Sequence, residues 1–158
     1  MPKYRLLSKS ELTELEKEFI EYLILNGITA EDWEQLKKTD PNQVEQIIVL
    51  FSDVVFESIL RKINFLEYRE KTSLKIFQCL SDKLVLVSME SNDDEYCNFT
   101  DPEFIKKSCS TPPDALKVFT TSRAYKRNRE SELFEMLQTG CLITDDKLFK
   151  ALCLLLTK

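Results

Sequence analysis

The spacing of apolar residues changes once along this chain, near residue 62, and that change restricts the fold more than any other feature. Before it, apolar side chains recur every three to four residues, as on one face of a helix. From residue 63 to residue 89 they alternate with polar ones, as in half-buried strands. Helices first, a run of strands next and helices last favour an α+β fold over alternating βαβ units.

The first 62 residues carry the signals of three helices. Ser8 and Glu11 form a capping box that starts the first helix, which we expect to continue to a stop at Gly27. Thr29 caps a short second helix, and Pro41 opens the third. An apolar stripe marks this third helix as the expected centre of the core. The stripe consists of Val44, Ile47, Ile48, Phe51, Val55 and Ile59.

Three strands follow the helices, at residues 63–69, 74–80 and 84–89. Ser81 and Asp82 are expected to form a tight hairpin turn between the last two strands. Because the strands are contiguous and the connections are short, they should form an antiparallel meander.

Beyond residue 90 the sequence predicts one polar loop and four helices. The loop is rich in acidic residues and has no periodicity. Pro112 and Pro113 interrupt the chain between the first two helices, and Gly140 ends the third. The helices are expected from Pro102 to Ser108, from Asp114 through Lys126, from Glu130 to Thr139, and after a cap at Thr144.

Together these patterns predict an α+β fold: a predominantly helical single domain with a three-stranded antiparallel meander in the middle. A chain of 18.5 kDa has about the size of one ordinary domain. The expected single globular domain, 1–158, consists of helices within 8–66, the meander at 62–90, the acidic loop at 91–101 and C-terminal helices at 102–157.

Composition removes most familiar chemistry. No residue is histidine, only Gly27 and Gly140 are glycine, and neighbouring cysteines are at least twelve positions apart. The chain therefore lacks the usual general base at neutral pH, a glycine-rich phosphate loop and cysteine pairs with zinc-ligand spacing. We expect no catalytic residue, no metal site and no cofactor, and we expect the five cysteines to be free thiols.

The acidic loop supports one hypothesis of catalysis. Asp93, Asp94 and Asp101 would serve a carboxylate- or metal-dependent hydrolase if they converge on a pocket. An EF-hand loop that begins at Asp93 fails, because Cys97 takes a ligand position and Asn98 stands where glycine makes the turn. A solvated surface loop is the simpler interpretation.

A basic cluster supports a different hypothesis. Arg123, Lys126, Arg127 and Arg129 lie at the end of an expected helix and just after it. In a nucleic-acid-binding accessory protein these side chains would contact phosphates. Cations near a helix C-terminus are also favoured by the helix dipole, so a purely structural role is the alternative.

Trp33 is the only tryptophan, on a short amphipathic segment between two stronger helices. Tryptophan is enriched at the centres of protein interfaces, although a core position is the alternative. With Tyr4 and Arg5 as expected neighbours, Trp33 marks the surface where we predict protein binding.

Four short segments carry a resemblance that spans nearly the whole chain. They are Tyr4-Arg5-Leu6-Leu7-Ser8, Ile28-Thr29-Ala30-Glu31-Asp32-Trp33, Phe51-Ser52-Asp53 and Gly140-Cys141-Leu142-Ile143-Thr144. In these segments the chain resembles a family of uncharacterised Bacteroidota proteins. The resemblance implies a cytoplasmic single-domain protein of unknown function, and it supplies no catalytic residue.

The expected function is therefore that of a non-enzymatic cytoplasmic protein-interaction or regulatory domain, with another protein as its partner. No signal-peptide pattern and no membrane-spanning stretch is visible in the sequence, so we expect no membrane contact. Nucleic-acid binding through the basic cluster is the first alternative, and hydrolysis at the acidic loop is the second.

Overall fold

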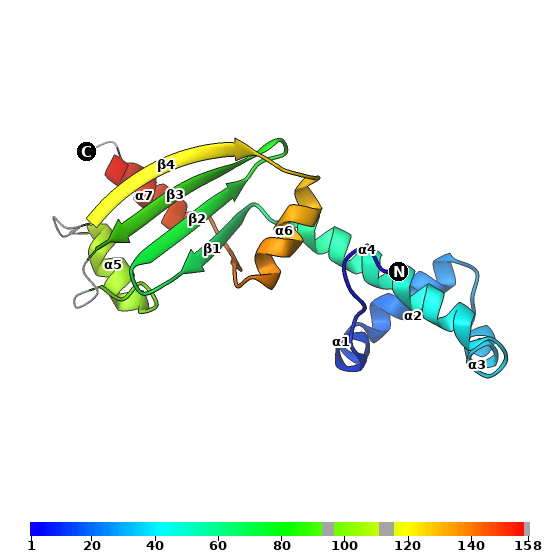
Figure 1. Ribbon diagram of the computed structural model, residues 1–158. Coiled ribbons are helices and arrows are strands. Elements are labelled where there is room, and N and C mark those ends of the chain that lie inside the picture. Colours follow the sequence, from blue (N-terminus) through cyan, green and yellow to red (C-terminus); the bar gives the residue numbers. More distant parts are fainter. Residues whose placement is uncertain (93–96, 111–115, 157–158) are drawn as a thin grey trace. The chain divides into compact units, whose positions relative to one another are not determined.

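The computed structural model describes residues 1–92, 97–110 and 116–156, and it confirms the α+β class (Figure 1). Contacts along the chain divide it into two compact units, residues 1–61 and 62–158, which we call the N-terminal and C-terminal units. A single domain over the whole chain stays a prediction. Within the described ranges, none of the helices is long and apolar enough to span a bilayer.

The N-terminal unit is helical. Its elements are α1 (Lys9–Glu14), α2 (Glu16–Leu25), α3 (Ala30–Thr39) and α4 (Pro41–Lys62), the last of which ends at the unit boundary. The Ser8 capping box forms as predicted. The prediction of one continuous helix from Ser8 to Gly27 is wrong, however. Leu15 leaves helical geometry, at φ −100° and ψ 21°, and separates α1 from α2.

A five-stranded antiparallel sheet forms the centre of the C-terminal unit, in the order β4-β3-β2-β1-β5. The strands are β1 (Phe65–Arg69), β2 (Ser73–Cys79), β3 (Lys83–Ser91), β4 (Leu116–Ala124) and β5 (Leu142–Thr144). The predicted meander is confirmed as β1-β2-β3. Its second turn is also confirmed: the N–H of Leu80 donates to the carbonyl of Lys83 at 3.0 Å, around Ser81 and Asp82.

The prediction of a helix from Asp114 through Lys126 is wrong, because residues 116–124 form the strand β4. The strand pairs with β3 over its full length, from Leu116 opposite Ser91 to Ala124 opposite Lys83. β-branched and aromatic residues at 118–121 explain the outcome, since they disfavour a helix and suit a pleated strand. The two prolines that suggested a helix start lie outside the described residues.

The remaining helices are α5 (Pro102–Ser110), α6 (Arg129–Gln138) and α7 (Lys147–Leu156), and they confirm three predicted helices. Helix α7 packs across β2, β3 and β4 on one face of the sheet (Figure 1). The core of the unit lies between that face and α5 and α7. Its buried side chains include Leu74, Ile76, Val87, Met89, Phe99, Ile105 and Leu152.

Candidate functional site

Local sequence signals shape a groove between α2 and α3 in the N-terminal unit. Gly27, at φ 76°, ends α2 in a conformation that glycine adopts without strain. Thr29 then caps α3: its hydroxyl accepts from the N–H of Asp32 at 3.1 Å, and the Asp32 carboxylate accepts from the N–H of Thr29 at 3.2 Å. This capping box fixes the start of α3 and places Trp33 in the first turn of that helix.

Trp33 is the outer end of an aromatic stack. Its ring lies 5.2 Å from that of Phe19 on α2 at an interplanar angle of 77°, and the Phe19 ring lies 4.9 Å from that of Phe51 on α4. Edge-to-face contacts of this kind are favourable. Phe51 is 3% exposed, whereas Trp33 is only partly buried. The stack therefore leads from the core of the unit to its surface.

The groove between the two helices has a volume of about 360 Å³. Its walls are apolar and include Phe19, Ile20 and Ile24 of α2 and Trp33 of α3. Ile20 and Ile24 are one helical turn apart and are 47% and 63% exposed. Sequence reasoning missed these two residues, although residues 19–25 hold more apolar side chains than one buried stripe needs. The exposure of these two residues makes the groove a candidate contact site.

The groove is bordered by charged side chains. Glu16 and Glu34 line it together with Lys37, whose ammonium lies 3.2 Å from the Glu34 carboxylate and 5.9 Å from the centroid of the Trp33 ring. The N-terminal unit carries twelve Asp and Glu against seven Lys and Arg, whereas the C-terminal unit carries fifteen of each. The net charge of −5 therefore belongs to the unit that contains the groove.

Tyr4 and Arg5 contact α4 and α1. The Tyr4 ring lies 6.2 Å from the Phe56 ring, and the Arg5 guanidinium lies 4.8 Å from the centroid of the same ring. Arg5 also donates to both carboxylate oxygens of Glu11, at 2.9 and 3.0 Å. These hydrogen bonds, with those from Ser8, lower the pKa of Glu11 to about 2. Tyr4 and Arg5 thus meet at Phe56, whereas Trp33 packs on Phe19.

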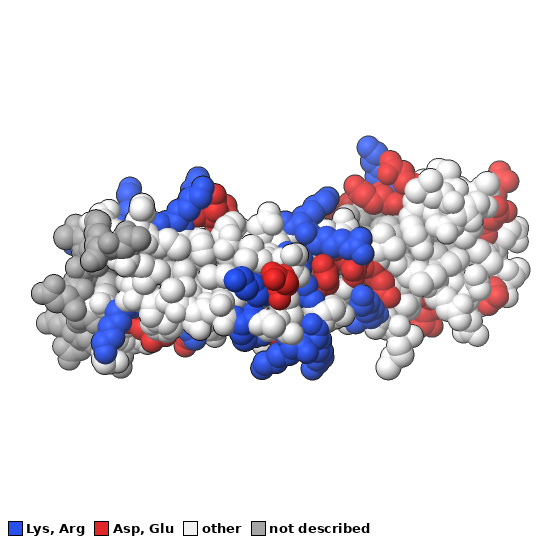
Figure 2. All heavy atoms as spheres, turned by 90° about the horizontal axis from the view of Figure 1, so that it is seen from above, with Lys and Arg blue, Asp and Glu red and all other residues white. Residues whose placement is uncertain are grey.

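The basic cluster lies at the end of β4 and the start of α6, and much of its charge is paired. Arg123 lies 2.7 Å from Glu132, and Arg127 lies 2.8 Å from Glu135. Figure 2 shows Lys and Arg gathered over this end of the sheet with acidic side chains among them. Nucleic-acid binding by the cluster, which includes Lys126, stays a prediction.

Arg129 is a structural member of that cluster. Its side chain is 13% exposed and donates to the carbonyls of Ile63, Cys79 and Leu80. Ile63 lies just before β1, Cys79 is the last residue of β2, and Leu80 follows it. The hydroxyl of Tyr125 donates to the same Leu80 carbonyl at 2.7 Å, and burial raises the pKa of Tyr125 to about 12. These bonds tie the start of α6 to the ends of two strands.

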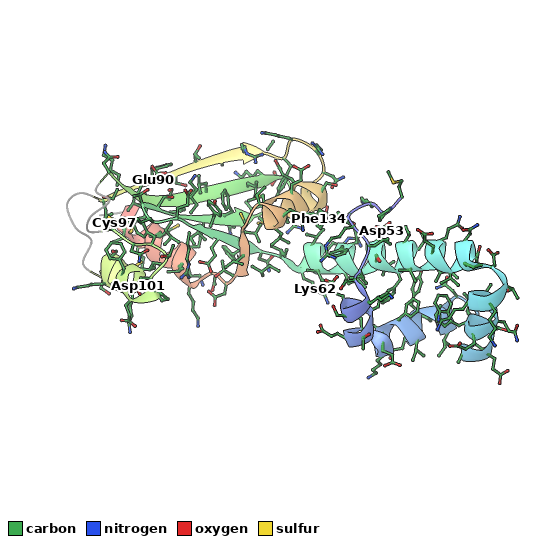
Figure 3. The ribbon with its side chains drawn as sticks, turned by 60° about the horizontal axis from the view of Figure 1, so that its bottom comes forward. Asp53, Lys62, Glu90, Cys97, Asp101 and Phe134 are labelled. Atoms are coloured by element: carbon green, nitrogen blue, oxygen red, sulfur yellow. The ribbon has the colours of Figure 1, made fainter. Side chains whose placement is uncertain are left out.

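The structure describes one of the three carboxylates proposed for hydrolysis. Asp93 and Asp94 lie outside the described residues. Asp101 precedes α5, where its Oδ1 accepts from the N–H of Glu103 at 3.1 Å, and Cys97 is buried in the core (Figure 3). Within the described ranges, no three His, Cys, Asp or Glu side chains are close enough together to hold a metal ion. Asp101 is therefore a helix cap, and hydrolysis stays a prediction.

The cysteines are free thiols, as expected, and burial makes several of them poor nucleophiles. Burial raises the pKa of Cys79 to about 12, and it also raises the pKa values of Cys109 and Cys141. Since the thiolate is the reactive form, these three side chains act as small apolar groups.

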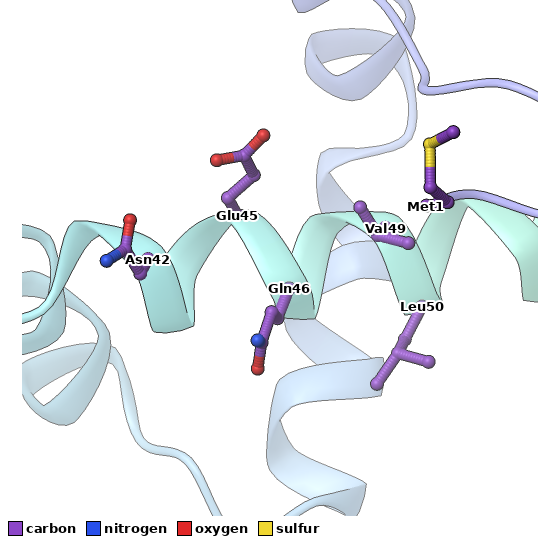
Figure 4. A pocket seen from close by; sticks show the side chains of 6 residues that line it. All are labelled: Met1, Asn42, Glu45, Gln46, Val49 and Leu50. Atoms are coloured by element: carbon purple, nitrogen blue, oxygen red, sulfur yellow. The ribbon is translucent and has the colours of Figure 1, made fainter.

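A second depression, of about 550 Å³, follows the surface of α4. Figure 4 shows that its side chains project in different directions, with Glu45 pointing away from Gln46 and Leu50. Ligand pockets need polar groups that converge on one point, and these polar groups diverge along one helix. The groove between α2 and α3 is therefore the stronger candidate site.

The fold and the site define an α+β protein with an apolar groove in an acidic helical unit. The chain belongs to a family of unknown function (DUF6495), whose model matches residues 1–157. This result confirms the resemblance to an uncharacterised family, and an origin in Bacteroidota stays a prediction. No curated protein and no solved structure matches the chain.

Proposed function

We propose that the protein is a non-enzymatic, cytoplasmic interaction domain that binds an amphipathic helix of another protein in the groove between α2 and α3. The observation that carries this proposal is the exposure of Ile20 and Ile24 beside the partly buried Trp33. Burying these apolar groups against a partner is favourable at about 25 cal/mol per Å² of apolar surface removed from water.

The form of the groove supports a helical ligand. It lies between two helices and is lined by apolar side chains from both, including Ile24 and Trp33. An amphipathic helix fits such a surface by laying a few apolar anchors, three or four residues apart, into it. Trp33 packs on Phe19, which in turn packs on the buried Phe51. The wall of the groove is therefore formed before the ligand binds.

Charge favours a basic partner. Two carboxylates, of Glu16 and Glu34, border the groove against one cation, Lys37, and the unit around it carries the net charge of the chain. The acidic N-terminal unit of a second copy would be repelled from the groove, whereas a helix with Lys or Arg beside its apolar stripe would be attracted.

The test uses Trp33, which is the only tryptophan and therefore reports occupancy of the groove by its fluorescence. The protein is titrated with a synthetic Leu- and Lys-rich amphipathic helix and with a Leu- and Glu-rich helix of the same pattern. We expect a blue shift with the basic peptide, and an affinity at least roughly tenfold weaker for the acidic peptide.

Matched variants locate the contact. Ile24→Lys places a charge in the groove wall and should abolish binding, whereas Leu25→Lys changes the neighbouring residue, 86% exposed and not part of the wall, and should preserve it. Both substitutions add one cation to the last turn of α2, where the helix dipole favours it. Equal affinities for the two peptides, or equal loss in both variants, would contradict the proposal.

The same variants select the natural partner. The wild-type chain and both variants are used to capture proteins from native cytoplasm, and the retained proteins are compared. A partner of the groove is a protein that the wild type and Leu25→Lys retain and Ile24→Lys loses. If every captured protein is retained equally by all three chains, the groove is not the binding site.

A further inference from the structure

Strand β4 forms one edge of the sheet in the C-terminal unit. It is paired with β3 across nine residues in an unbroken register, and no strand in the described ranges pairs with its other side (Figure 1). Alternate residues of an edge strand direct their backbone N–H and C=O groups away from the sheet. Such a row of donors and acceptors is a template for another strand.

Sequence features that usually protect an edge are missing from the middle of β4. Residues 118–122 are Val, Phe, Thr, Thr and Ser, without charge, proline or glycine, and four of them are β-branched or aromatic. Charged side chains stand only towards the ends of the strand, at Lys117 and Arg123. The opposite edge, β5, is only three residues long, which is itself a protection. The long edge of the sheet is therefore suited to pairing.

We propose that β4 pairs with β4 of a second copy in an antiparallel, two-fold symmetric arrangement. The register that pairs all nine residues places Thr120 opposite Thr120 of the copy. It also places Phe119 opposite Thr121, and Val118 opposite Ser122. Aromatic pairs with β-branched residues, here Phe119 with Thr121, are favourable across antiparallel strands. Thr120, whose hydroxyl donates to the carbonyl of Leu86 at 2.9 Å, adds a β-branched side chain on the axis, so the strand is complementary to itself.

Charges near the strand ends oppose this register only weakly, because an acidic residue lies beside each cation. The register brings Lys117 of one copy opposite Arg123 of the other. Arg123 is already paired with Glu132 at 2.7 Å, and Lys117 stands opposite Glu90 in the β3–β4 ladder. The C-terminal unit also has equal numbers of acidic and basic residues, so two of these units do not repel one another through net charge.

The arrangement is tested by the mass of the full-length chain in solution, measured by light scattering. We expect the wild type to have twice the 18.5 kDa of the single chain. Thr120→Lys and Thr120→Glu each place two like charges on the symmetry axis, and each should weaken the dimer by roughly tenfold. An equimolar mixture of the two variants should restore dimers, because the charges on the axis are then opposite.

Position 121 supplies the control. Thr121 is exposed like its neighbour but faces Phe119 in this register, so mixing Thr121→Lys with Thr121→Glu should give no comparable recovery. Restored dimers at position 120 also show that both variants fold. A wild-type chain with the mass of one copy would overturn the proposal, and so would a dimer that the position 120 variants do not weaken.

Discussion

The guanidinium of Arg123 lies 2.7 Å from Oε1 of Glu132 and joins the end of β4 to α6. The Glu132 side chain is 8% exposed, and its Oε2 has no hydrogen-bond partner among the described residues. A buried carboxylate with one satisfied oxygen depends heavily on its cation. The pair therefore makes a residue of the predicted basic cluster part of the fold.

Removing the Arg123 cation should destabilise the protein. We expect Arg123→Met to lower the free energy of unfolding by about 1–3 kcal/mol, less than for a fully buried pair because the Arg123 side chain is 48% exposed. Urea denaturation of the two proteins measures the difference. Adding Glu132→Leu should recover part of the loss, since no uncompensated charge then remains; a double variant less stable than Arg123→Met contradicts this account.

Arg129 should not be replaceable by lysine. Its fork of donors reaches three carbonyls, those of Ile63, Cys79 and Leu80, and an ammonium cannot reproduce that geometry. We expect Arg129→Lys to cost about 2 kcal/mol of stability in urea denaturation. Arg127→Lys, at an exposed pair, is the control and should stay within about 0.5 kcal/mol. Equal effects would show that the three carbonyl contacts contribute little.

Ser52 should be important for the N-terminal unit despite its size. It is fully buried, its hydroxyl donates to the carbonyl of Ile48 at 2.7 Å, and its oxygen accepts from the N–H of Leu7 at 3.1 Å. Ser52→Ala leaves that N–H buried without a partner. It should lower the free energy of unfolding by about 1–3 kcal/mol and lower the melting temperature with it. Ser58→Ala, at an exposed position of α4, should have little effect. A similar melting temperature for both variants would contradict the prediction.

The Arg5–Glu11 pair should make stability depend on pH in acid. The pKa of Glu11 is lowered to about 2 from its ordinary value of 4.5, so the folded state holds this carboxylate ionised more strongly than the unfolded state does. Its contribution is present above pH 4.5 and is lost as the pH falls from 4.5 to about 2. Glu11→Gln keeps a side chain suited to the capping box but removes the charge. Denaturation across this interval should show a shallower pH dependence for the variant; parallel curves would exclude the pair as the cause.

The two glycines should respond differently to alanine. Both have positive φ, 76° at Gly27 and 117° at Gly140, so each substitution strains the backbone. A Cβ at Gly140 would also lie 3.2 Å from the Tyr68 ring, whereas at Gly27 nothing lies within 4 Å. We expect Gly27→Ala to cost about 1 kcal/mol and Gly140→Ala more than that, measured by urea denaturation. Gly27→Ala as the costlier change would contradict this order.

Sequence patterns predicted the elements whose signals are local. The capping box at Ser8, the helix cap at Thr29 and the hairpin at Ser81 and Asp82 depend on residues within a few positions of each other, and all form. Strand β4 was missed because its partner, β3, is distant in sequence and the preceding prolines resemble a helix start. Pairing with β3 decides the conformation of this segment, and no local signal reports it.

The candidate site was predictable in part. The single tryptophan on an amphipathic segment pointed to one residue of the groove, Trp33. The groove also depends on Ile20 and Ile24, which come from another helix. Tyr4 and Arg5 were expected near Trp33, yet the Leu7–Ser52 hydrogen bond holds the N-terminal segment along α4. Which residues share a surface is decided by tertiary contacts of this kind, not by distance in sequence.

The division of charge between the two units has a consequence for how ionic strength acts on the molecule. At about 0.1 M salt the screening length is roughly 10 Å, so attraction between exposed charges weakens as salt is added. Binding of a basic helix to the acidic N-terminal unit should weaken accordingly. Backbone pairing along β4 involves a unit with no net charge and should change little. If both proposals hold, dissolved salt should release the basic helix and leave the β4 pairing in place.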